Sequence, residues 1–285
     1  MHVHDSLGWS AIARRLQTAA PEAFPTAGQP LNLIGGRWSE PGRGKNVSSP
    51  VDGSVLGRLP MLDLEQARKA VAQAKAPAAA WGALPVESRI RKVHDWLALM
   101  KAQRETLALS LCWELGKTYA SALNSVDRTV SGVEWYTQNI DAMLRDQPAP
   151  GSDRREPLGL VSNIASWNYP LSVLVHACLV QALAGNTVIA KTPTDGGTMA
   201  ITLSFALASR CGIPLSLVSG SGGQLSEALV RSDEIDGFSF VGGKTIGRDL
   251  AARMIRPNTR HMLEMEGVNA YGIWQFSDWP SLSKQ

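Results

Sequence analysis

The sequence is poor in cysteine and nearly balanced in charge, and both features narrow the classes of protein to which it can belong. Its three cysteines, Cys112, Cys178 and Cys211, lie far apart and are too few for a disulfide framework. A reducing compartment suits them best, so we expect a cytoplasmic protein. The formal net charge is only +3, and the basic residues are scattered. We therefore expect no nucleic-acid partner and no attachment to a membrane surface.

No apolar run is long enough to span a bilayer. The longest, residues 170–184, contains a histidine and a glutamine and predicts a buried helix. The first residues lack the apolar core of a signal peptide. Residues 9–20 instead predict a weakly basic amphipathic helix, with a transit peptide as the less favoured alternative. The five histidines show no metal-ligand spacing, so we expect no metal site.

With 285 residues, 44% of them hydrophobic, the chain can form a sizeable core in one large domain or two modest ones. Residues 31–60 alternate short apolar stretches with glycine and proline, which predicts short strands joined by turns. Helix formers dominate residues 63–81, 86–111 and 117–145. The polar, proline-rich residues 146–157 predict a loop or an exposed hairpin.

From residue 158 onward the pattern alternates between short strands and helices. The predicted strands are residues 158–165, 186–191, 215–219, 237–242 and 260–265. The predicted helices are residues 170–184, 196–212, 224–232 and 244–255. Strands that alternate with helices in this way form a parallel sheet with right-handed crossovers. The sequence thus predicts an α/β fold, preceded by an arm of helices and short strands.

Polar residues and glycines gather where the predicted strands end. In an open parallel sheet these carboxyl ends share one edge, and ligands bind outside it. The strand ends carry an amide, an ammonium, two glycine turns and two carboxylates: Asn168, Lys191, residues 220–223, residues 242–243, Glu264 and Glu266. Each alone is more often structural, as a turn amide, a solvated lysine or a common glycine turn. Their co-occurrence at successive strand ends predicts a ligand site.

The chemistry of these residues suits a phosphate-bearing ligand. Glycine turns that lead into helices let backbone N–H groups approach a phosphate, and Lys191 adds a charge or a donor to a ribose hydroxyl. The turn at 220–225 is not the usual dinucleotide fingerprint, because Leu225 replaces its third glycine. Glu264 and Glu266 are two apart in a predicted strand and would share a face, which suits a general base. Two solvated carboxylates on an edge strand are an equally favoured alternative.

Taken together, these segments resemble the aldehyde dehydrogenase superfamily. The resemblance begins at residues 34–60, passes through Glu-Leu-Gly-Lys at 114–117 and is strongest from residue 157 onward. Its most specific motifs are Ser-Trp-Asn-Tyr-Pro at 166–170, Gly-Asn-Thr-Val-Ile-Ala-Lys-Thr-Pro at 185–193 and Phe-Val-Gly-Gly-Lys-Thr-Ile-Gly at 240–247. The resemblance implies a Rossmann-like parallel sheet with flanking helices. It also implies the NAD(P)-dependent oxidation of an aldehyde to a carboxylic acid.

The resemblance implies roles for single residues as well. Asn168 resembles the amide of the family's oxyanion hole, which stabilises the developing oxyanion. Glu264 resembles the general base that activates a cysteine or the hydrolytic water, Lys191 the lysine that bonds the adenosine ribose. The implied cofactor-binding residues are Ala165, Ser166, Trp167, Lys191, Gly220, Gly222, Gly242, Gly243 and Gly247.

By the same resemblance the chain divides into four parts. Residues 1–138 are an N-terminal arm and helices of the cofactor domain, and residues 139–157 are an oligomerisation hairpin. Residues 158–267 are the Rossmann-like NAD(P)-binding core, and residues 268–285 start a truncated catalytic domain. The surface that this last domain normally covers would be exposed and apolar. We therefore expect a homo-oligomer or a partner chain to cover it.

Several positions depart from the family pattern. Thr194 stands where NAD-preferring members often have a carboxylate, so the sequence allows both NAD and NADP as cofactors. Gly243 replaces a serine that usually bonds the diphosphate, and Ser226 replaces a glycine. Glu266 and Val268 replace the first glycine and the lysine of the motif that contains the base.

The family's reaction also needs a cysteine thiolate that attacks the aldehyde. Only 21 residues follow Glu264, none of them is cysteine, and none of the chain's cysteines stands at the nucleophile's position. We therefore expect that the chain alone does not oxidise aldehydes. The alternatives are a non-catalytic NAD(P)-binding or partner-binding module and an inert fragment of a longer enzyme.

Overall fold

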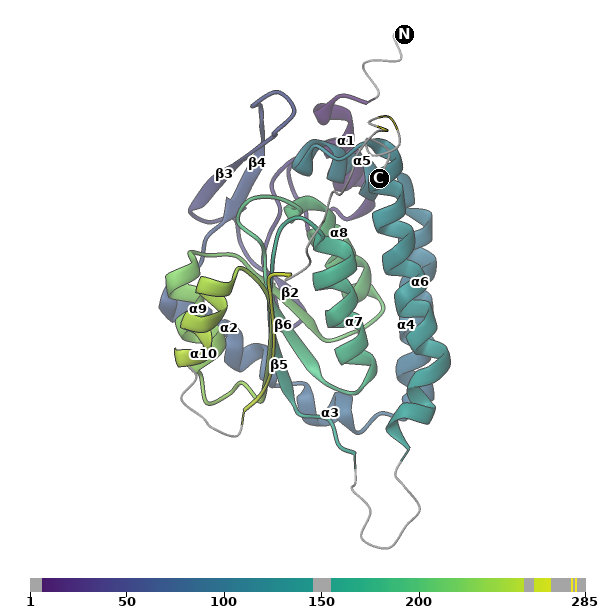
Figure 1. Ribbon diagram of the computed structural model, residues 1–285, viewed down its shortest axis with the longest axis vertical. Coiled ribbons are helices and arrows are strands. Elements are labelled where there is room, and N and C mark those ends of the chain that lie inside the picture. Colours follow the sequence, from purple (N-terminus) through teal and green to yellow (C-terminus); the bar gives the residue numbers. More distant parts are fainter. Residues whose placement is uncertain (1–6, 146–154, 254–258, 268–277, 279, 281–285) are drawn as a thin grey trace, which may run out of the picture.

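The computed structural model describes residues 7–145, 155–253, 259–267, 278 and 280. Within these residues the centre is a seven-stranded sheet with helices on both faces (Figure 1). Across the sheet the strands run in the order β2-β1-β7-β6-β5-β8-β9. The first parallel strand, β5 (Leu160–Ala165), therefore lies inside the sheet, and the later strands are added on either side of it.

The five predicted parallel strands are confirmed. They are β5, β6 (Thr187–Lys191), β7 (Leu215–Val218), β8 (Gly237–Gly242) and β9 (Arg260–Met265). The register sets Ile164 beside Lys191 and Ala165 beside Val241, so the carboxyl ends of β5, β6 and β8 meet at one edge. All five residues of β6 are buried, because helices cover both faces of the sheet.

Four further strands come before the parallel ones in the described part of the chain. β1 (Leu33–Ile34) pairs antiparallel with β7, and β2 (Arg37–Trp38) pairs with β1. β3 (Gly44–Ser48) and β4 (Val55–Pro60) form a separate antiparallel hairpin. The short strands predicted here are therefore present. A strand of two residues, such as β1 or β2, is too short to show alternation in the sequence. Its place in the main sheet therefore depends on tertiary contacts.

The helices between the parallel strands cover both faces. α7 (His176–Leu183) and α8 (Thr198–Arg210) lie on one face, and α9 (Gly222–Arg231) and α10 (Lys244–Arg253) lie on the other (Figure 1). A π-helical turn, η2 (Pro170–Val175), precedes α7, so the single helix predicted there has two parts. Proline fits the first position of a helix because no N–H donor is needed there.

Six α-helices precede β5 in the described part of the chain: α1 (Trp9–Ala19), α2 (Leu64–Lys75), α3 (Ala78–Gly82), α4 (Val86–Ala102), α5 (Arg104–Leu115) and α6 (Tyr119–Leu144). Two of the predicted helices are each divided. Pro77 lies in the break after α2, because proline lacks the N–H that would continue a helix. The break at Gln103 has no glycine or proline. Both helices pack against α6 and α8, but α4 also packs against α7, whereas α5 also packs against α1.

The hairpin expected over residues 139–157 falls partly on a helix and partly on residues that the structure does not describe. Residues 139–144 form the last turns of α6, and residues 146–154 lie outside the described residues. The expected start of a further domain at 268–285 lies outside them as well, apart from two single residues. Both features therefore stay predictions.

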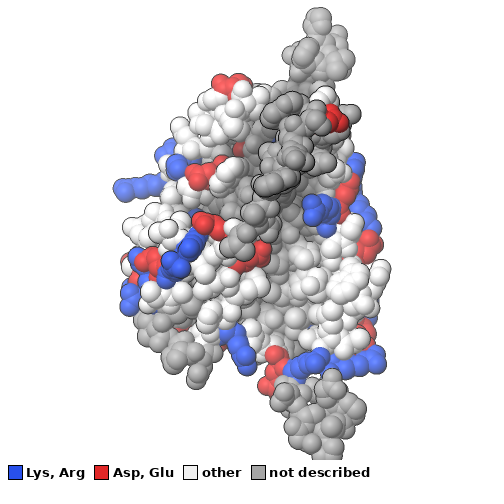
Figure 2. Space-filling model, viewed as in Figure 1, with Lys and Arg blue, Asp and Glu red and all other residues white. Residues whose placement is uncertain are grey.

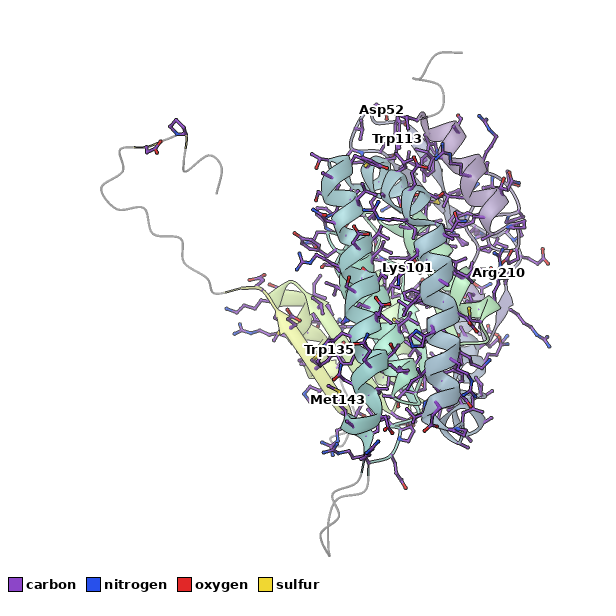
Figure 3. The ribbon with its side chains drawn as sticks, turned by 90° about the vertical axis from the view of Figure 1, so that its right-hand side faces the viewer. Asp52, Lys101, Trp113, Trp135, Met143 and Arg210 are labelled. Atoms are coloured by element: carbon purple, nitrogen blue, oxygen red, sulfur yellow. The ribbon has the colours of Figure 1, made fainter. Side chains whose placement is uncertain are left out.

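The main core lies between the sheet and the layer of α4, α6, α7 and α8. Trp96 of α4 is fully buried there, and its Nε1–H donates to the carbonyl oxygen of Ser204 in α8 at 3.1 Å. α4 and α6 lie side by side (Figure 3), where Lys101 Nζ is 3.0 Å from Glu134 Oε1.

On the surface, positive and negative side chains are interspersed over the face that Figure 2 shows. None of the described helices is both long and apolar enough to cross a membrane.

Candidate functional site

A cavity of about 550 Å³ opens at the carboxyl edge of the parallel sheet, beyond the ends of β5, β6 and β8. Its volume lies in the range usual for small-molecule sites, roughly 300–1,000 Å³. The strand ends, the loop after β6, the first turn of α9 and one side of α10 line it. In folds of this kind the same edge is where ligands bind.

Seven of the nine residues implied to bind a cofactor line this cavity: Ala165, Ser166, Trp167, Lys191, Gly222, Gly242 and Gly243. They come from segments that are far apart in the sequence and that the sheet brings together. Among the described residues, Gly220, Gly247, Asn168 and Glu264 do not line it. The fold thus assembles most of the implied cofactor site. The two implied catalytic residues adjoin it, because Asn168 accepts a hydrogen bond from Ser166 and Glu264 pairs with Val241, but they do not line it.

Lys191, the last residue of β6, is only 8% exposed, so its ammonium is held at a fixed place in the cavity wall. Its Nζ donates to the carbonyl oxygen of Thr192 at 3.0 Å and to Thr194 Oγ1 at 3.4 Å. Burial lowers the pKa of this ammonium, the carboxylate of Asp195 opposes that change, and Lys45 adds to it. One N–H bond remains for a ligand hydroxyl or phosphate, because an ammonium has three.

Two helix N-termini adjoin the cavity, one that begins with glycine and one that follows a glycine. Gly222 begins α9, and a side-chain carbon placed on Gly222 or Gly223 would meet nothing within 4 Å. On Gly243, before α10, such a carbon would meet only Glu266 Oε1, at 3.7 Å. The first N–H groups of a helix are unpaired within it and carry partial positive charge. Glycine leaves room for an anionic group to approach them.

Gly220 and Gly247 are needed for packing rather than for the cavity. A side-chain carbon on Gly220 would lie 2.8 Å from Leu225 Cγ and 3.0 Å from the carbonyl oxygen of Leu62. On Gly247 it would lie 2.4 Å from Met265 Sδ, where α10 packs on β9. Close helix–strand packing therefore accounts for both glycines. Their position does not support the implied contact with a cofactor.

Asn168 lies in the exposed bend between β5 and η2. Its Oδ1 accepts a hydrogen bond from Ser166 Oγ at 2.7 Å, which orients the amide and leaves its N–H₂ group unpaired among the described residues. Trp167 and Tyr169, on either side, are each 46% exposed. Lys117 Nζ lies 4.3 Å from the centroid of the Tyr169 ring. The bend therefore presents an oriented amide donor at the surface.

Glu264 and Glu266 do not share a strand face, so that prediction is wrong. β9 ends at Met265, and Glu266 adopts a left-handed conformation with φ of 45°. Its Oε1 accepts a hydrogen bond from the backbone N–H of Lys244 at 3.0 Å, so Glu266 caps the start of α10. Glu264 stays in β9, beside Val241 of β8, and is exposed. The turn of the backbone between them gives the two carboxylates separate surroundings.

The cavity also has lining residues to which the sequence analysis assigned no role. Ile246, Asp249 and Arg253 line one side of it from α10, and Asp249 Oδ2 forms an ion pair with Arg253 Nε at 2.8 Å. Asp195 adds a carboxylate from the loop after β6. The α10 residues recur at intervals of three and four, which puts them on one helix face. This spacing is the feature of the sequence from which their shared position could have been predicted.

The three cysteines lie away from the cavity. Cys178 is fully buried in α7, and Cys112 and Cys211 are half-buried near the ends of α5 and α8. Burial raises the pKa of all three thiols. They are therefore protonated at neutral pH, whereas a nucleophilic cysteine acts as its thiolate.

Comparison with known proteins identifies the family. Residues 38–284 match the aldehyde dehydrogenase family. Over 245 residues the chain is 31% identical to the non-phosphorylating aspartate-semialdehyde dehydrogenase of Halomonas elongata, and the match covers 82% of this chain and 50% of that enzyme.

Solved structures agree with this match. An aldehyde dehydrogenase from Brucella melitensis biovar abortus is similar with a TM-score of 0.78 and 28% identity, over 83% of this chain and 51% of that one. The NADP-dependent glyceraldehyde-3-phosphate dehydrogenase of Bacillus halodurans, complexed with NADP, is similar with a TM-score of 0.73 and 26% identity, over 83% and 52%. The chain spans about half the length of these relatives. Sequence and fold together show that it belongs to the aldehyde dehydrogenase family.

Proposed function

We propose that the carboxyl edge of the sheet binds NAD or NADP, and that the chain contributes the cofactor half of an aldehyde dehydrogenase. The observation that carries this proposal is the cavity at which Lys191 and two glycine-led helix N-termini meet. Family membership supports it, as does the NADP-complexed relative from Bacillus halodurans.

The residues around the cavity fit the parts of a dinucleotide. A diphosphate needs N–H donors and room for close approach, which the start of α9 at Gly222 offers. At the start of α10, beside Gly243, the N–H of Lys244 already donates to Glu266 Oε1, so a phosphate there would have to displace that carboxylate. A ribose hydroxyl needs a partner at a fixed position, which the buried ammonium of Lys191 offers. Trp167 and Ile246 supply exposed apolar surface at the same cavity. Bound NAD(P)⁺ would supply the hydride acceptor of the family's reaction.

Asn168 has the chemistry of an oxyanion donor. Because Ser166 Oγ bonds its Oδ1, the N–H₂ group can donate to a carbonyl oxygen that becomes negative during the reaction. Glu264, exposed in β9, would serve as the general base. Neither residue lines the cofactor cavity, so the aldehyde would bind beside it, next to the bend that carries Asn168.

None of the chain's cysteines is the nucleophile in this proposal, because their thiols lie away from the cavity and their pKa values are raised. We therefore propose that cofactor binding, and not aldehyde oxidation, is the property of this chain on its own. The same observation favours the alternative of a non-catalytic NAD(P)-binding or partner-binding module. Dehydrogenase activity that thiol alkylation abolishes would favour the enzyme over the module.

Isothermal titration calorimetry of the purified chain with NAD⁺ and with NADP⁺ tests the proposal. We expect at least one cofactor to bind, and the affinity to fall by roughly tenfold or more in Lys191→Met, which removes a charged donor. Lys69→Met is the matched control, since Lys69 is exposed on α2 and paired with Glu65. Failure of both cofactors to bind, or equal losses in the two variants, would contradict the proposal.

A further inference from the structure

Residues 114–117, Glu-Leu-Gly-Lys, span the end of α5 and the start of the turn that leads to α6, and they have no role in the proposed function. Gly116 ends α5 in a left-handed conformation with φ of 66°, and its N–H donates to the carbonyl oxygen of Cys112 at 2.9 Å. The chain therefore turns tightly, and Glu114 and Lys117 stand at the two ends of one corner. We call these four residues the 114–117 corner.

Glu114 holds the first turn of α8. It is 1% exposed, its Oε1 accepts the backbone N–H of Met199 at 2.8 Å, and its Oε2 accepts that of Ala200 at 3.2 Å. The residue at the N-cap of α8, Gly197, has no side chain that could do this. A carboxylate from another helix therefore satisfies N–H groups that α8 cannot satisfy itself.

The loop that leads from β6 to α8 lines the cofactor cavity with Pro193, Thr194 and Asp195. Gly196 and Gly197 join this loop to the helix, with φ of 149° and 79°. A side-chain carbon on Gly196 would lie 2.4 Å from Leu115 Cδ2, and one on Gly197 would lie 2.6 Å from Pro170 Cβ. The end of the cavity loop is thus wedged between the 114–117 corner and the start of η2.

Lys117 contacts the bend that presents Asn168. Its Nζ is 4.3 Å from the centroid of the Tyr169 ring, within the range of a cation–π interaction. Tyr169 follows Asn168 directly, and Pro170 comes next. The corner therefore touches the cavity loop at one end and the Asn168 bend at the other.

We propose that the 114–117 corner is a positioning element that fixes the cofactor loop and the Asn168 bend relative to each other. Glu114 and Lys117 are positioning residues that contact neither cofactor nor aldehyde. Residues that lock the segments carrying a site hold its groups in the productive geometry. The consequence for binding rests on the proposed function, because the two segments act together only where cofactor and aldehyde meet.

Three variants separate positioning from simple stability. Glu114→Gln keeps the shape of the side chain but turns an N–H₂ group toward a backbone N–H, so one of the two hydrogen bonds is lost. Lys117→Met keeps the length of the side chain and removes the charge above Tyr169. Trp96→Phe is the matched control, since Trp96 bonds Ser204 farther along α8, away from the loop.

Hydrogen exchange followed by mass spectrometry reads the backbone without any cofactor. We expect faster exchange in Glu114→Gln over residues 192–200 and 165–172, in Lys117→Met over 165–172 alone, and in Trp96→Phe over neither. The affinity for NAD⁺, measured by calorimetry, is the second readout. We expect it to fall by roughly fivefold or more in Glu114→Gln and by less than about twofold in Trp96→Phe.

Unchanged exchange in both segments of Glu114→Gln and Lys117→Met would overturn the proposal, and so would equal changes in Trp96→Phe. If the wild-type chain binds no NAD⁺, the proposed function fails, while the exchange data still decide whether the corner holds the two segments. If Glu114→Gln does not fold, Lys117→Met still decides, because Lys117 is only half-buried and its loss spares the first turn of α8.

Discussion

Lys191 Nζ and Thr194 Oγ1 lie 3.4 Å apart at the proposed cofactor cavity, one on the last residue of β6 and the other three residues along the chain. Neither side chain carries negative charge. A 2′-phosphate on the adenosine ribose would meet an ammonium and a hydroxyl at this pair, and the carboxylate of Asp195 follows one residue farther along the loop. This pair supports our proposal that the cavity accepts NADP as well as NAD.

A carboxylate at position 194 should lower the affinity of the cavity for NADP⁺. In Thr194→Glu we expect the affinity for NADP⁺ to fall by roughly tenfold or more, because two negative groups would share one place, and the affinity for NAD⁺ to stay within about twofold. Thr194→Gln, of similar size and without the charge, should retain both affinities. Calorimetric titration measures the three proteins. Equal losses in the Glu and Gln variants would mean that shape, and not charge, selects the cofactor.

Glu114 should make the protein less stable as the pH rises. Burial raises its pKa from the ordinary 4.5 to about 7, although its hydrogen bonds from backbone N–H groups oppose this change. Between these two values the unfolded chain has released the proton that the folded chain still holds. The free energy of unfolding therefore falls with rising pH and levels off above about 7, by on the order of 3 kcal/mol in total.

Urea unfolding between about pH 5 and about pH 8 measures this fall. Glu114→Gln should lack that part of the pH dependence, because glutamine does not titrate. Glu65→Gln should retain it, since the Glu65 side chain is 79% exposed on the surface of α2. A pH dependence in Glu114→Gln as steep as that of the wild type would assign the effect to another group.

Gly222 and Gly247 should respond to alanine in opposite ways. In Gly222→Ala the added carbon meets open space, so the free energy of unfolding should change by less than about 0.5 kcal/mol while cofactor affinity falls. In Gly247→Ala the added carbon presses on Met265, which should cost about 1–3 kcal/mol of that free energy. Urea unfolding and NAD⁺ titration of both variants check this. If Gly247→Ala instead lowered the affinity for NAD⁺ and left the free energy of unfolding unchanged, Gly247 would belong to the cofactor site.

The surface around the Asn168 bend should make the chain associate. Trp167 and Tyr169 are each 46% exposed, and Ile246 on α10 is 59% exposed. Apolar side chains of this size lower the free energy when another surface covers them. We expect sedimentation velocity to show association that grows with concentration and that Ile246→Lys weakens. A single monomeric species at every concentration would count against this expectation.

The parallel sheet could be predicted because each strand is a short apolar run that ends at glycine or a polar residue. Strand β6 is the clearest case: it is buried along its whole length and ends at Lys191. Because the carboxyl ends of parallel strands share one edge, the residues at those ends could be predicted to lie together, and most of them line the cavity. Local sequence and packing agree in this part of the chain.

Other features depend on backbone geometry and packing that periodicity does not carry. Alternation put Glu266 in the strand, but its left-handed φ turns it onto the start of α10. Gly247 is the last residue of the motif at 240–247, yet the reason for a glycine there is the close approach of the Met265 side chain. The break between α4 and α5 at Gln103 has no local signal, because contacts with other helices determine it.

Hydrogen exchange of the wild-type chain with and without saturating NADP⁺ tests the central claim most directly. We predict slower exchange with NADP⁺ over residues 165–167, 191–195, 222–224 and 242–244, which line the cavity or adjoin it, and no change in β1 and β2. Protection at none of these four segments would contradict the claim that the carboxyl edge of the sheet binds the cofactor.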